Sequence, residues 1–191
     1  MIASPNADYI SPETYLELEQ HSLLKHEYRQ GQVYTIAGAS NAHVLIALNV
    51  ASALRNHSRG RGCLTYISDT KAHIESVNTY YYPDVIVSCD QRDRAFDNFL
   101  RYPCLIVEVL SSTTEAFDRG DKFADYRQIN SLQEYVLISQ TRIRVECFRR
   151  NLEGQWVLYT YGEADEIHLE SVNFRCRVGD LYEDVSLAPQ S

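Results

Sequence analysis

The chain has 191 residues, of which 45% are hydrophobic and 23% are charged, and its formal net charge is −8. This composition is that of soluble globular proteins, and it excludes collagen-like, low-complexity and disordered chains as well as a membrane-spanning one, since no apolar run approaches the roughly 20 residues needed. The length favours a single domain over residues 1–191, and the negative charge means that any role with nucleic acid needs a local basic surface or a bound cation.

The chain is expected to begin with a short helix and a hairpin. Ser11 precedes a proline and a glutamate, an arrangement typical of a helix N-terminus, so we expect a helix over residues 12–20. A β-hairpin is expected next, with arms over residues 26–29 and 32–37 around Gly31.

A longer helix is expected after the hairpin. Ser40 or Asn41 caps it, and it continues to about His57. Apolar residues at helical spacing predict the face that packs on the core: Val44, Ala47, Leu48, Ala51 and Leu54.

Apolar strands dominate the rest of the chain, interrupted by one amphipathic helix from Thr114 to about Ile129. The strands at residues 84–88 and 104–110 are almost continuously apolar, as expected of central strands covered on both faces. Further strands are expected over 64–68, 71–75, 134–139, 143–147, 156–161, 166–169 and 174–178. The sequence therefore predicts a mixed α/β fold, with a central sheet flanked by helices and extra C-terminal strands.

Two acidic residues stand where apolar residues are expected. Asp84 follows Pro83 at the beginning of one apolar strand, and Glu108 lies inside another. An ionised carboxylate in a central strand is costly unless a cation or a donor neutralises it. Consecutive strands are often neighbours, so the two carboxylates are expected to converge at one end of the sheet.

The following helix adds a lysine to this pattern. Asp118, Lys122 and Tyr126 are four residues apart and therefore share one helical face, which can look back at the end of the strand that carries Glu108. Two carboxylates and a lysine in a cleft suit metal-assisted cleavage of a phosphodiester bond. Carboxylate oxygens hold Mg²⁺ or Mn²⁺, while a lysine can orient the attacking water or stabilise the transition state.

These residues resemble those of the PD-(D/E)xK, or restriction-endonuclease-like, superfamily, and more closely those of a large bacterial family of endonucleases long catalogued as a domain of unknown function. The matching segments lie in order between about residues 10 and 140 and contain Glu27, His43, Pro83-Asp84-Val85, Glu108-Val109-Leu110-Ser111, and Asp118 to Lys122 with Tyr126.

The resemblance implies a restriction-endonuclease-like sheet, Asp84 and Glu108 as metal ligands, Glu27 as a possible third acid, Mg²⁺-dependent cleavage of DNA, and a homodimer. The superfamily pattern places lysine two residues after the second acid, where this chain has Leu110. In the similar family the lysine is found on the following helix, which makes Lys122 its substitute.

Each candidate also has a purely structural interpretation. Asp84 can cap a turn, Glu108 can sit in a structural ion pair, Lys122 and Glu27 can be solvated surface charges, and His43 can pack or cap its helix. Two groups of arginines can either contact phosphates or occupy solvated edges: Arg55, Arg59 and Arg61 beside Gly60 and Gly62, and Arg142, Arg144, Arg149 and Arg150.

The cysteines and the first residues favour a cytoplasmic protein. Residues 1–8 lack the charged and then apolar segments of a secretory signal. The five cysteines are scattered and contain no CxxC pair, so we expect neither a zinc ribbon nor a disulfide framework.

Two functions remain open from the sequence. One is a Mg²⁺-dependent nuclease that acts on DNA through Asp84, Glu108, Lys122 and Glu27. The other is a non-enzymatic module that keeps the fold for protein interaction or assembly, which the acidic net charge favours.

Overall fold

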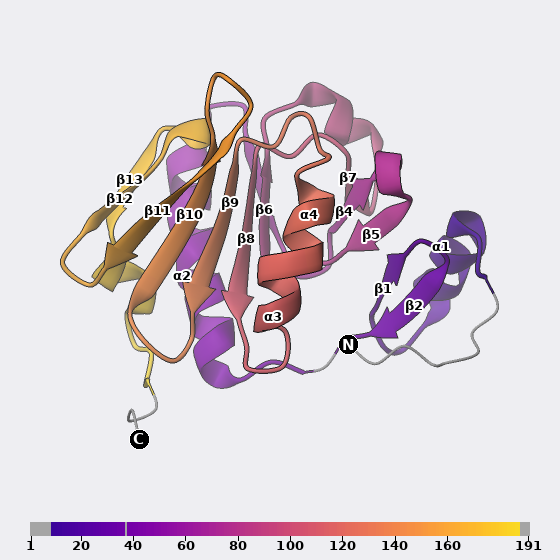
Figure 1. Ribbon diagram of the computed structural model, residues 1–191, viewed down its shortest axis with the longest axis horizontal. Coiled ribbons are helices and arrows are strands. Elements are labelled where there is room, and N and C mark those ends of the chain that lie inside the picture. The colour runs from indigo at the N-terminus through magenta and orange to yellow at the C-terminus, as the bar shows by residue number, and fades with distance from the viewer. Residues whose placement is uncertain (1–8, 37, 188–191) are drawn as a thin grey trace.

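The computed structural model describes residues 9–36 and 38–187, and its centre is a mixed six-stranded sheet. Figure 1 shows a helical layer on each face of this sheet. Only the β8–β9 pair is parallel, and the remaining pairs are antiparallel. The strand order is β11 (Trp156–Gly162), β10 (Arg144–Arg150), β9 (Glu134–Ser139), β8 (Leu105–Leu110), β6 (Val85–Ser88) and β3 (Leu64–Ile67).

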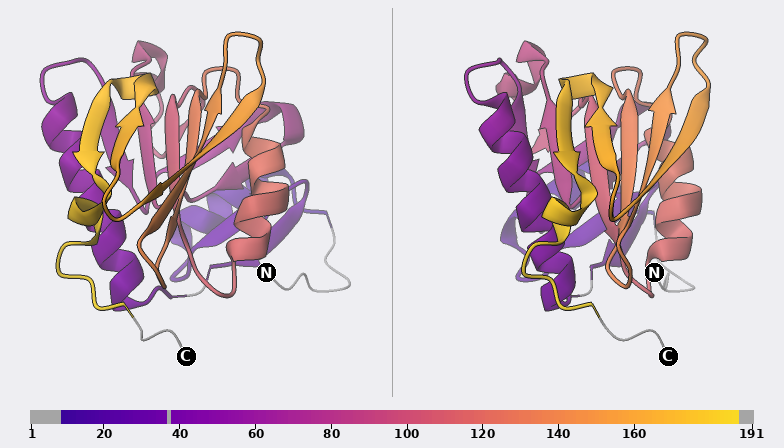
Figure 2. Two further views of the ribbon diagram at one scale, coloured as in Figure 1. Left: turned by 60° about the vertical axis from the view of Figure 1, so that its left-hand side comes forward. Right: turned by 90° about the vertical axis from the view of Figure 1, so that its left-hand side faces the viewer.

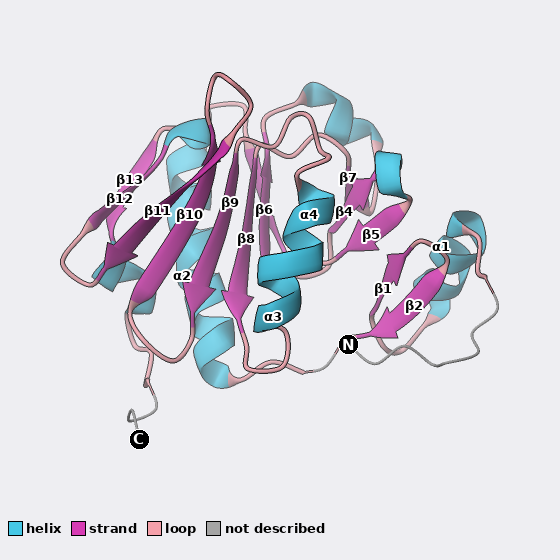
Figure 3. Cartoon of the chain, viewed as in Figure 1, coloured by secondary structure: helices cyan, strands magenta, loops and turns pink. Residues whose placement is uncertain are grey.

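A second, five-stranded sheet lies beside the first and holds the N-terminal hairpin (Figure 3). Its order is β2 (Gln32–Thr35), β1 (His26–Arg29), β5 (Thr79–Tyr81), β4 (Lys71–Ile74) and β7 (Phe99–Leu100). The hairpin was expected, whereas β5 and β7 were not, because two or three residues are too few to show a periodic pattern. Ala37, the expected end of the second arm, lies outside the described residues.

Helix α1 (Pro12–His21) covers the second sheet with an aromatic cluster. Its predicted cap is confirmed, since the Ser11 hydroxyl accepts a hydrogen bond from the Thr14 amide at 3.2 Å. Tyr15 is buried against Tyr28 and Tyr80, with ring centroids 5.0 and 5.7 Å away. This packing fixes α1 on β1 and β5 of the second sheet.

Helix α2 (Asn41–Ser58) packs on one face of the large sheet together with the hairpin of β12 (Glu166–Leu169) and β13 (Phe174–Arg177). Figure 2 shows α2 running along the height of the sheet. The predicted helix is confirmed, but its predicted face is partly wrong: Val44 and Leu48 are half exposed. The helix is apolar on two adjacent faces, and the sheet takes the face with Ile46, Val50 and Leu54.

The opposite face of the large sheet is covered by α3 (Glu115–Phe117), a π-helical segment η3 (Asp118–Lys122) and α4 (Phe123–Tyr126). The sequence predicted one regular helix from Thr114 to about Ile129; the chain is helical from Glu115 to Tyr126, with a wider π-helical turn over η3, and the helix ends three residues earlier than predicted. Phe123 and Tyr126 pack against Tyr135 of the sheet below. π-Helical turns are rare and often lie at functional sites.

Short 3₁₀ turns connect the remaining elements: η1 (Glu75–Val77), η2 (Gln91–Ala95), η4 (Glu170–Val172) and η5 (Val178–Tyr182). Within the described ranges, no helix is long and apolar enough to cross a membrane.

The cysteines depart from expectation, because Cys63 and Cys89 form a disulfide. They are 26 residues apart in sequence, but β3 and β6 pair with Leu64 opposite Ser88, which brings the residues beyond them together. Sequence spacing alone gave no sign of this pairing. The Sγ atom of Cys104 lies 3.6 Å from that of Cys89.

Candidate active site

Asp84 and Glu108 lie side by side at one end of the large sheet, as expected from the order of their strands. β6 and β8 are antiparallel neighbours with Val85 opposite Val107, so the residues next to this pair are also opposite each other. The Asp84 Oδ2 atom accepts a hydrogen bond from the Val109 amide at 2.7 Å. This bond fixes the Asp84 carboxylate against β8, one residue from Glu108.

Glu108 is buried, and its carboxylate contacts two groups from the covering helical segment. Its Oε1 atom lies 2.9 Å from the Lys122 Nζ atom and accepts a hydrogen bond from the Tyr126 hydroxyl at 3.0 Å. Lys122 and Tyr126 therefore do share the face that their spacing predicts, and this face points at the strand end.

Lys122 is the centre of the cluster. Its ammonium lies 3.0 Å from Glu27, 2.9 Å from Glu108 and 3.7 Å from Asp118. Glu27 comes from β1 of the second sheet, and its Oε1 atom also accepts a hydrogen bond from the Tyr82 amide at 3.0 Å. The structure thus joins the four predicted site residues from four separate segments of the chain.

His43 is the second partner of the Asp84 carboxylate. Ser40 caps α2 by accepting a hydrogen bond from the His43 amide, which places His43 in the first turn. The His43 Nε2 atom lies 2.8 Å from Asp84 Oδ1. Both oxygens of Asp84 therefore have a partner, one from α2 and one from β8.

Burial and charge set the protonation of this cluster. Burial, opposed by Lys122 but reinforced by Asp118, Asp84 and Glu27, raises the pKa of Glu108 well above its usual value. Burial alone would lower the pKa of Lys122, but Glu108, Glu27 and Asp118 outweigh it and raise that pKa well above its usual value. Lys122 is therefore a permanent ammonium, suited to orienting oxygen atoms rather than to removing protons.

The cluster lies at the base of a cleft of about 610 Å³ between the two sheets. Glu27, Asp84, Glu108, Asp118 and Lys122 line the cleft, and the beginning of α2 and the turn before α3 complete its wall. Asp84 is the most exposed of the acids, with 22% of its side chain accessible, while Glu108 and Asp118 have 5%.

The donor set fits a hard divalent cation. Three carboxylates contact the single ammonium of Lys122, and Asp84, which contacts His43, adds a fourth acid to the group, so the acids outnumber the lysine. In the described part of the chain no three His, Cys, Asp or Glu side chains form a ready-made metal cage. Mg²⁺ does not need one, because it commonly binds one or two carboxylates and completes its shell with water and substrate phosphates. Asp84 and Glu108 are the pair that would hold it.

Sequence reasoning gave too little weight to Asp118 and His43. Asp118 was placed on the correct helical face, but a single acid on a helix usually points to solvent; here burial raises its pKa despite the nearby ammonium of Lys122. For Asp118 the sequence signal was its position four residues before Lys122, and for His43 it was its position in the first turn of α2.

Two of the four arginines predicted as a cluster near β10 form ion pairs within the protein. Arg149 lies 2.8 Å from Glu134 and 2.5 Å from Glu170, while Arg144 lies 2.9 Å from Glu146. Arg150 donates to the Asn130 carbonyl at 3.2 Å, and Arg142 is exposed, so only part of the cluster is neutralised.

Comparisons with known proteins agree with the fold. A family model, Uma2, described as "Putative restriction endonuclease", matches residues 12–178. Two proteins of Synechocystis sp., both named only as uncharacterized, are similar: one is 40% identical over 185 residues (95% of this chain, 97% of the relative), and the other is 37% identical over 157 residues (80% and 88%).

A solved structure supports the predicted fold class directly. A crystal structure described as "a putative nuclease belonging to DUF820 from Anabaena variabilis" superposes with a TM-score of 0.76. The match covers 91% of this chain and 98% of that chain at 16% sequence identity. The restriction-endonuclease-like mixed α/β fold is therefore confirmed.

Proposed function

Because the chain belongs to the Uma2 family of restriction-endonuclease-like proteins, we propose that it is a metal-dependent endonuclease that hydrolyses phosphodiester bonds in DNA. The observation that carries the proposal is the position of Lys122, which a π-helical segment places between Glu27, Glu108 and Asp118 at the base of a cleft. The lysine missing from its usual strand position is thereby supplied from the neighbouring helical segment.

In this proposal Asp84 and Glu108 hold Mg²⁺ or Mn²⁺, and the other groups support them. A bound divalent ion would lower the pKa of a water molecule and neutralise charge on the phosphate. The Lys122 ammonium donates hydrogen bonds that orient the water or a phosphate oxygen. Glu27 fixes the position of Lys122, while His43 and the Val109 amide fix that of Asp84.

Cleavage assays with matched variants test the assignment. Purified protein should nick or cut plasmid DNA with Mg²⁺ or Mn²⁺, and Asp84→Ala or Glu108→Ala should abolish cleavage. Asp121→Asn is the control, because Asp121 lies on the same π-helical segment but pairs with Arg29 outside the cleft. Undiminished cleavage by both site variants would contradict the proposal.

A crystal soaked in Mn²⁺ tests the metal separately from the reaction. Anomalous density between Asp84 and Glu108 is expected. Its absence at millimolar Mn²⁺ would remove the metal from the proposal.

A non-enzymatic module is the second candidate, and the pairing of basic side chains favours it. Arg119, Arg144 and Arg149 all form internal ion pairs in a chain of net charge −8, so these three cations are not available to a DNA backbone. Titration at low salt separates the two: binding of Mn²⁺ and DNA supports the nuclease, and no binding of either supports the module.

We propose further that two copies form a homodimer. The support is an exposed apolar pair at the rim of the cleft, where Leu23 is fully exposed and Leu24 is 61% exposed. Light scattering should report a dimer that Leu23→Glu converts to a monomer; a monomeric wild-type protein would contradict this.

A further inference from the structure

A separate cavity lies at the far end of α2 from the carboxylate cluster. It has a volume of about 310 Å³ and lies where α2 ends and β3 begins. α2 has 18 residues and is therefore about 27 Å long, with His43 contacting Asp84 in its first turn and Ser58 lining the cavity at its end. The two sites thus lie at opposite ends of α2, the helix that runs along the height of the sheet in Figure 2.

Arginines without partners surround this cavity. Arg55, Arg59 and Arg94 line it, and within the described residues none of them has an ion pair, a hydrogen bond or a ring contact. No acidic residue is among those that line it. Arg29, Arg119 and Arg149 are paired with carboxylates elsewhere in the molecule. Three guanidinium groups without such partners beside one cavity therefore set this region apart.

Two buried hydroxyl groups in the cavity wall also lack partners. Ser58 is only 4% exposed, and neither its Oγ atom nor Thr65 Oγ1 has a hydrogen-bond partner. These are two of the four unpartnered buried side-chain atoms in the part of the chain that the structure describes. Buried polar groups are nearly always satisfied, so two open hydroxyls just beneath one cavity mark a place where a small shift of the lining would let a bound oxygen acceptor complete them.

We propose that this cavity binds the phosphate group of a small molecule. Guanidinium groups recognise phosphate through paired, charge-assisted hydrogen bonds, and the tetrahedral group has enough acceptor oxygens for arginines and hydroxyls together. The volume lies at the small end of ligand pockets, which suits inorganic phosphate or a nucleoside monophosphate. The site is independent of the proposed cleavage chemistry.

The loop after α2 supplies a matched control. Gly60 and Gly62 both have left-handed backbone angles, φ 76° and 88°, and they carry Arg61 between them. Arg61 does not line the cavity; its guanidinium lies 3.4 Å from His57 Nε2. Arg59 and Arg61 therefore have the same charge and the same loop but different surroundings.

Isothermal titration calorimetry on the full chain, with inorganic phosphate and adenosine 5′-monophosphate as probes, tests the proposal. Arg55→Ala and Arg59→Ala should each weaken binding about 10- to 100-fold, as expected for loss of a charged hydrogen bond, while Arg61→Ala should leave it unchanged. No binding of either probe at millimolar concentration would overturn the proposal, as would equal losses in Arg59→Ala and Arg61→Ala. Duplex DNA that requires Arg59 while neither probe binds would also overturn it.

Ser58→Ala separates a binding role from a structural one. Removing an unpaired buried hydroxyl should leave the melting temperature without phosphate unchanged or higher, and should reduce the rise that phosphate causes. Full phosphate affinity in the Ser58→Ala/Thr65→Val double variant would contradict the proposal. Because the readout is binding, the result does not depend on whether the protein cleaves DNA.

Discussion

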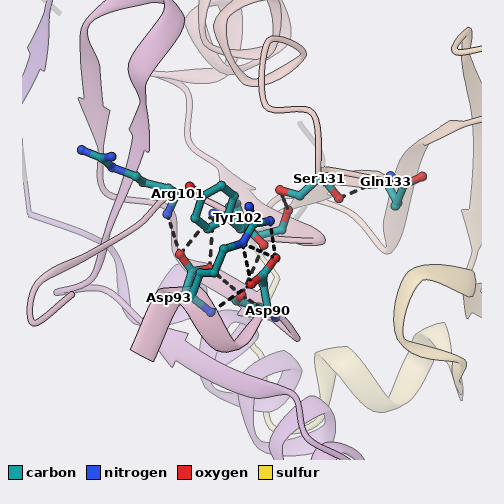
Figure 4. A network of polar contacts seen from close by, with 9 residues as sticks. Asp90, Asp93, Arg101, Tyr102, Ser131 and Gln133 are labelled. Atoms are coloured by element: carbon teal, nitrogen blue, oxygen red, sulfur yellow. Dashed lines mark hydrogen bonds and ion pairs between the residues drawn. The ribbon is translucent and has the colours of Figure 1, made fainter. Parts of the chain in front are cut away.

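β6 has an acidic side chain near each of its ends, and the protein treats the two in opposite ways. Asp93, beyond the C-terminal end, is buried and accepts hydrogen bonds from the Ser88 hydroxyl at 2.5 Å, the Arg101 amide at 2.8 Å and the Tyr102 amide at 3.2 Å (Figure 4). Its charge is satisfied by neutral donors that the local backbone supplies.

Asp84, before the N-terminal end, belongs to a group of four carboxylates that share Lys122 and His43. Here the carboxylates outnumber their cationic partners, and burial, reinforced by the neighbouring acids, raises the pKa of Glu108. The two sites differ in the number of hydrogen-bond donors and cations around each carboxylate, and not in burial. A carboxylate whose acceptor atoms are all satisfied stabilises a turn, whereas a group of carboxylates with too few donors (the under-supplied group below) can accept a cation.

The same criterion explains Glu134, a second acid at the edge of an apolar strand. It is fully buried in β9, yet it accepts hydrogen bonds from Arg149 Nε at 2.8 Å, from Ser171 Oγ at 2.6 Å and from the Glu170 and Ser171 amides. An acid in an apolar strand is therefore not in itself evidence of a metal site.

The largest effect is expected for Lys122→Met, which removes the one lysine of the under-supplied group. Leaving Glu27, Glu108 and Asp118 buried without it should destabilise the protein by about 3–5 kcal/mol at pH 7.5 in urea denaturation. Carboxylates whose pKa is raised in the folded state favour folding below their unfolded pKa and oppose it above. The loss should therefore be smaller at pH 5 than at pH 7.5.

Lys71→Met is the matched control for this experiment. Lys71 is equally buried, but it lies over the Tyr82 ring at 5.0 Å and has no carboxylate within 4.0 Å, and burial lowers its pKa. Its replacement should cost little and should show no such change with pH. Equal losses in the two variants would mean that the carboxylates do not depend on Lys122.

Asp93→Ala should show the second largest effect and should act on stability alone. It leaves the Arg101 and Tyr102 amides without an acceptor, while the Ser88 hydroxyl keeps only its 3.2 Å bond to the Tyr102 carbonyl, which should cost about 2–4 kcal/mol in urea denaturation. Asp84→Asn keeps the shape at the other end of β6 and should cost less than about 1 kcal/mol while it weakens Mn²⁺ binding. A large stability loss in Asp84→Asn would remove the contrast between the two ends.

The sequence predicted one side of this contrast, the group around Lys122, because some of its causes are local. The apolar runs of β6 and β8 identified central strands, and the spacing of Lys122 and Tyr126 identified a helical face. These patterns depend only on neighbouring residues, so they can be found without coordinates. They were enough to bring Asp84, Glu108 and Lys122 together.

What the sequence could not supply depends on distant segments. Glu27 reaches Lys122 only because a second sheet packs beside the first, and Cys63 meets Cys89 only through the register of β3 and β6. The saturation of Asp93 comes from amides eight and nine residues later in the chain. Pairings of this kind are set by tertiary packing, which no periodic pattern records.

A smaller effect on stability is expected when the pH is lowered, and it comes from a histidine next to the network around Asp93. Arg101, whose amide donates to Asp93, also donates from Nε to His73 Nδ1 at 3.2 Å. Burial and Arg101 lower the pKa of His73 to about 4, against about 6.5 in an unfolded chain. His73 therefore stabilises the fold above pH 6.5, and this contribution is lost as the pH falls toward 4.

Urea denaturation of wild type and His73→Phe between pH 7 and pH 4 measures this contribution. Phenylalanine keeps the stacking on Tyr80 but does not titrate. Wild type should lose about 1–3 kcal/mol more than the variant over this range, whereas His21→Gln, at an exposed residue, should follow wild type. Parallel curves for wild type and His73→Phe would show that His73 is not held neutral.

The smallest effect tests how finely Glu108 is positioned. Burial and Glu108 raise the pKa of Tyr126 well above its usual value, so its hydroxyl remains a donor to Glu108 throughout the assay range. Tyr126→Phe should cost about 1 kcal/mol in stability. It should also weaken Mn²⁺ binding about tenfold, because the carboxylate loses a bond that fixes its orientation.

Tyr81→Phe is the control, because it breaks a comparable bond, from Tyr81 to Asp125 at 2.6 Å, outside the group around Lys122. Tyr81→Phe should reduce stability by a similar amount and leave the Mn²⁺ affinity unchanged. If Tyr126→Phe and Tyr81→Phe bind Mn²⁺ equally well, Tyr126 only stabilises the fold.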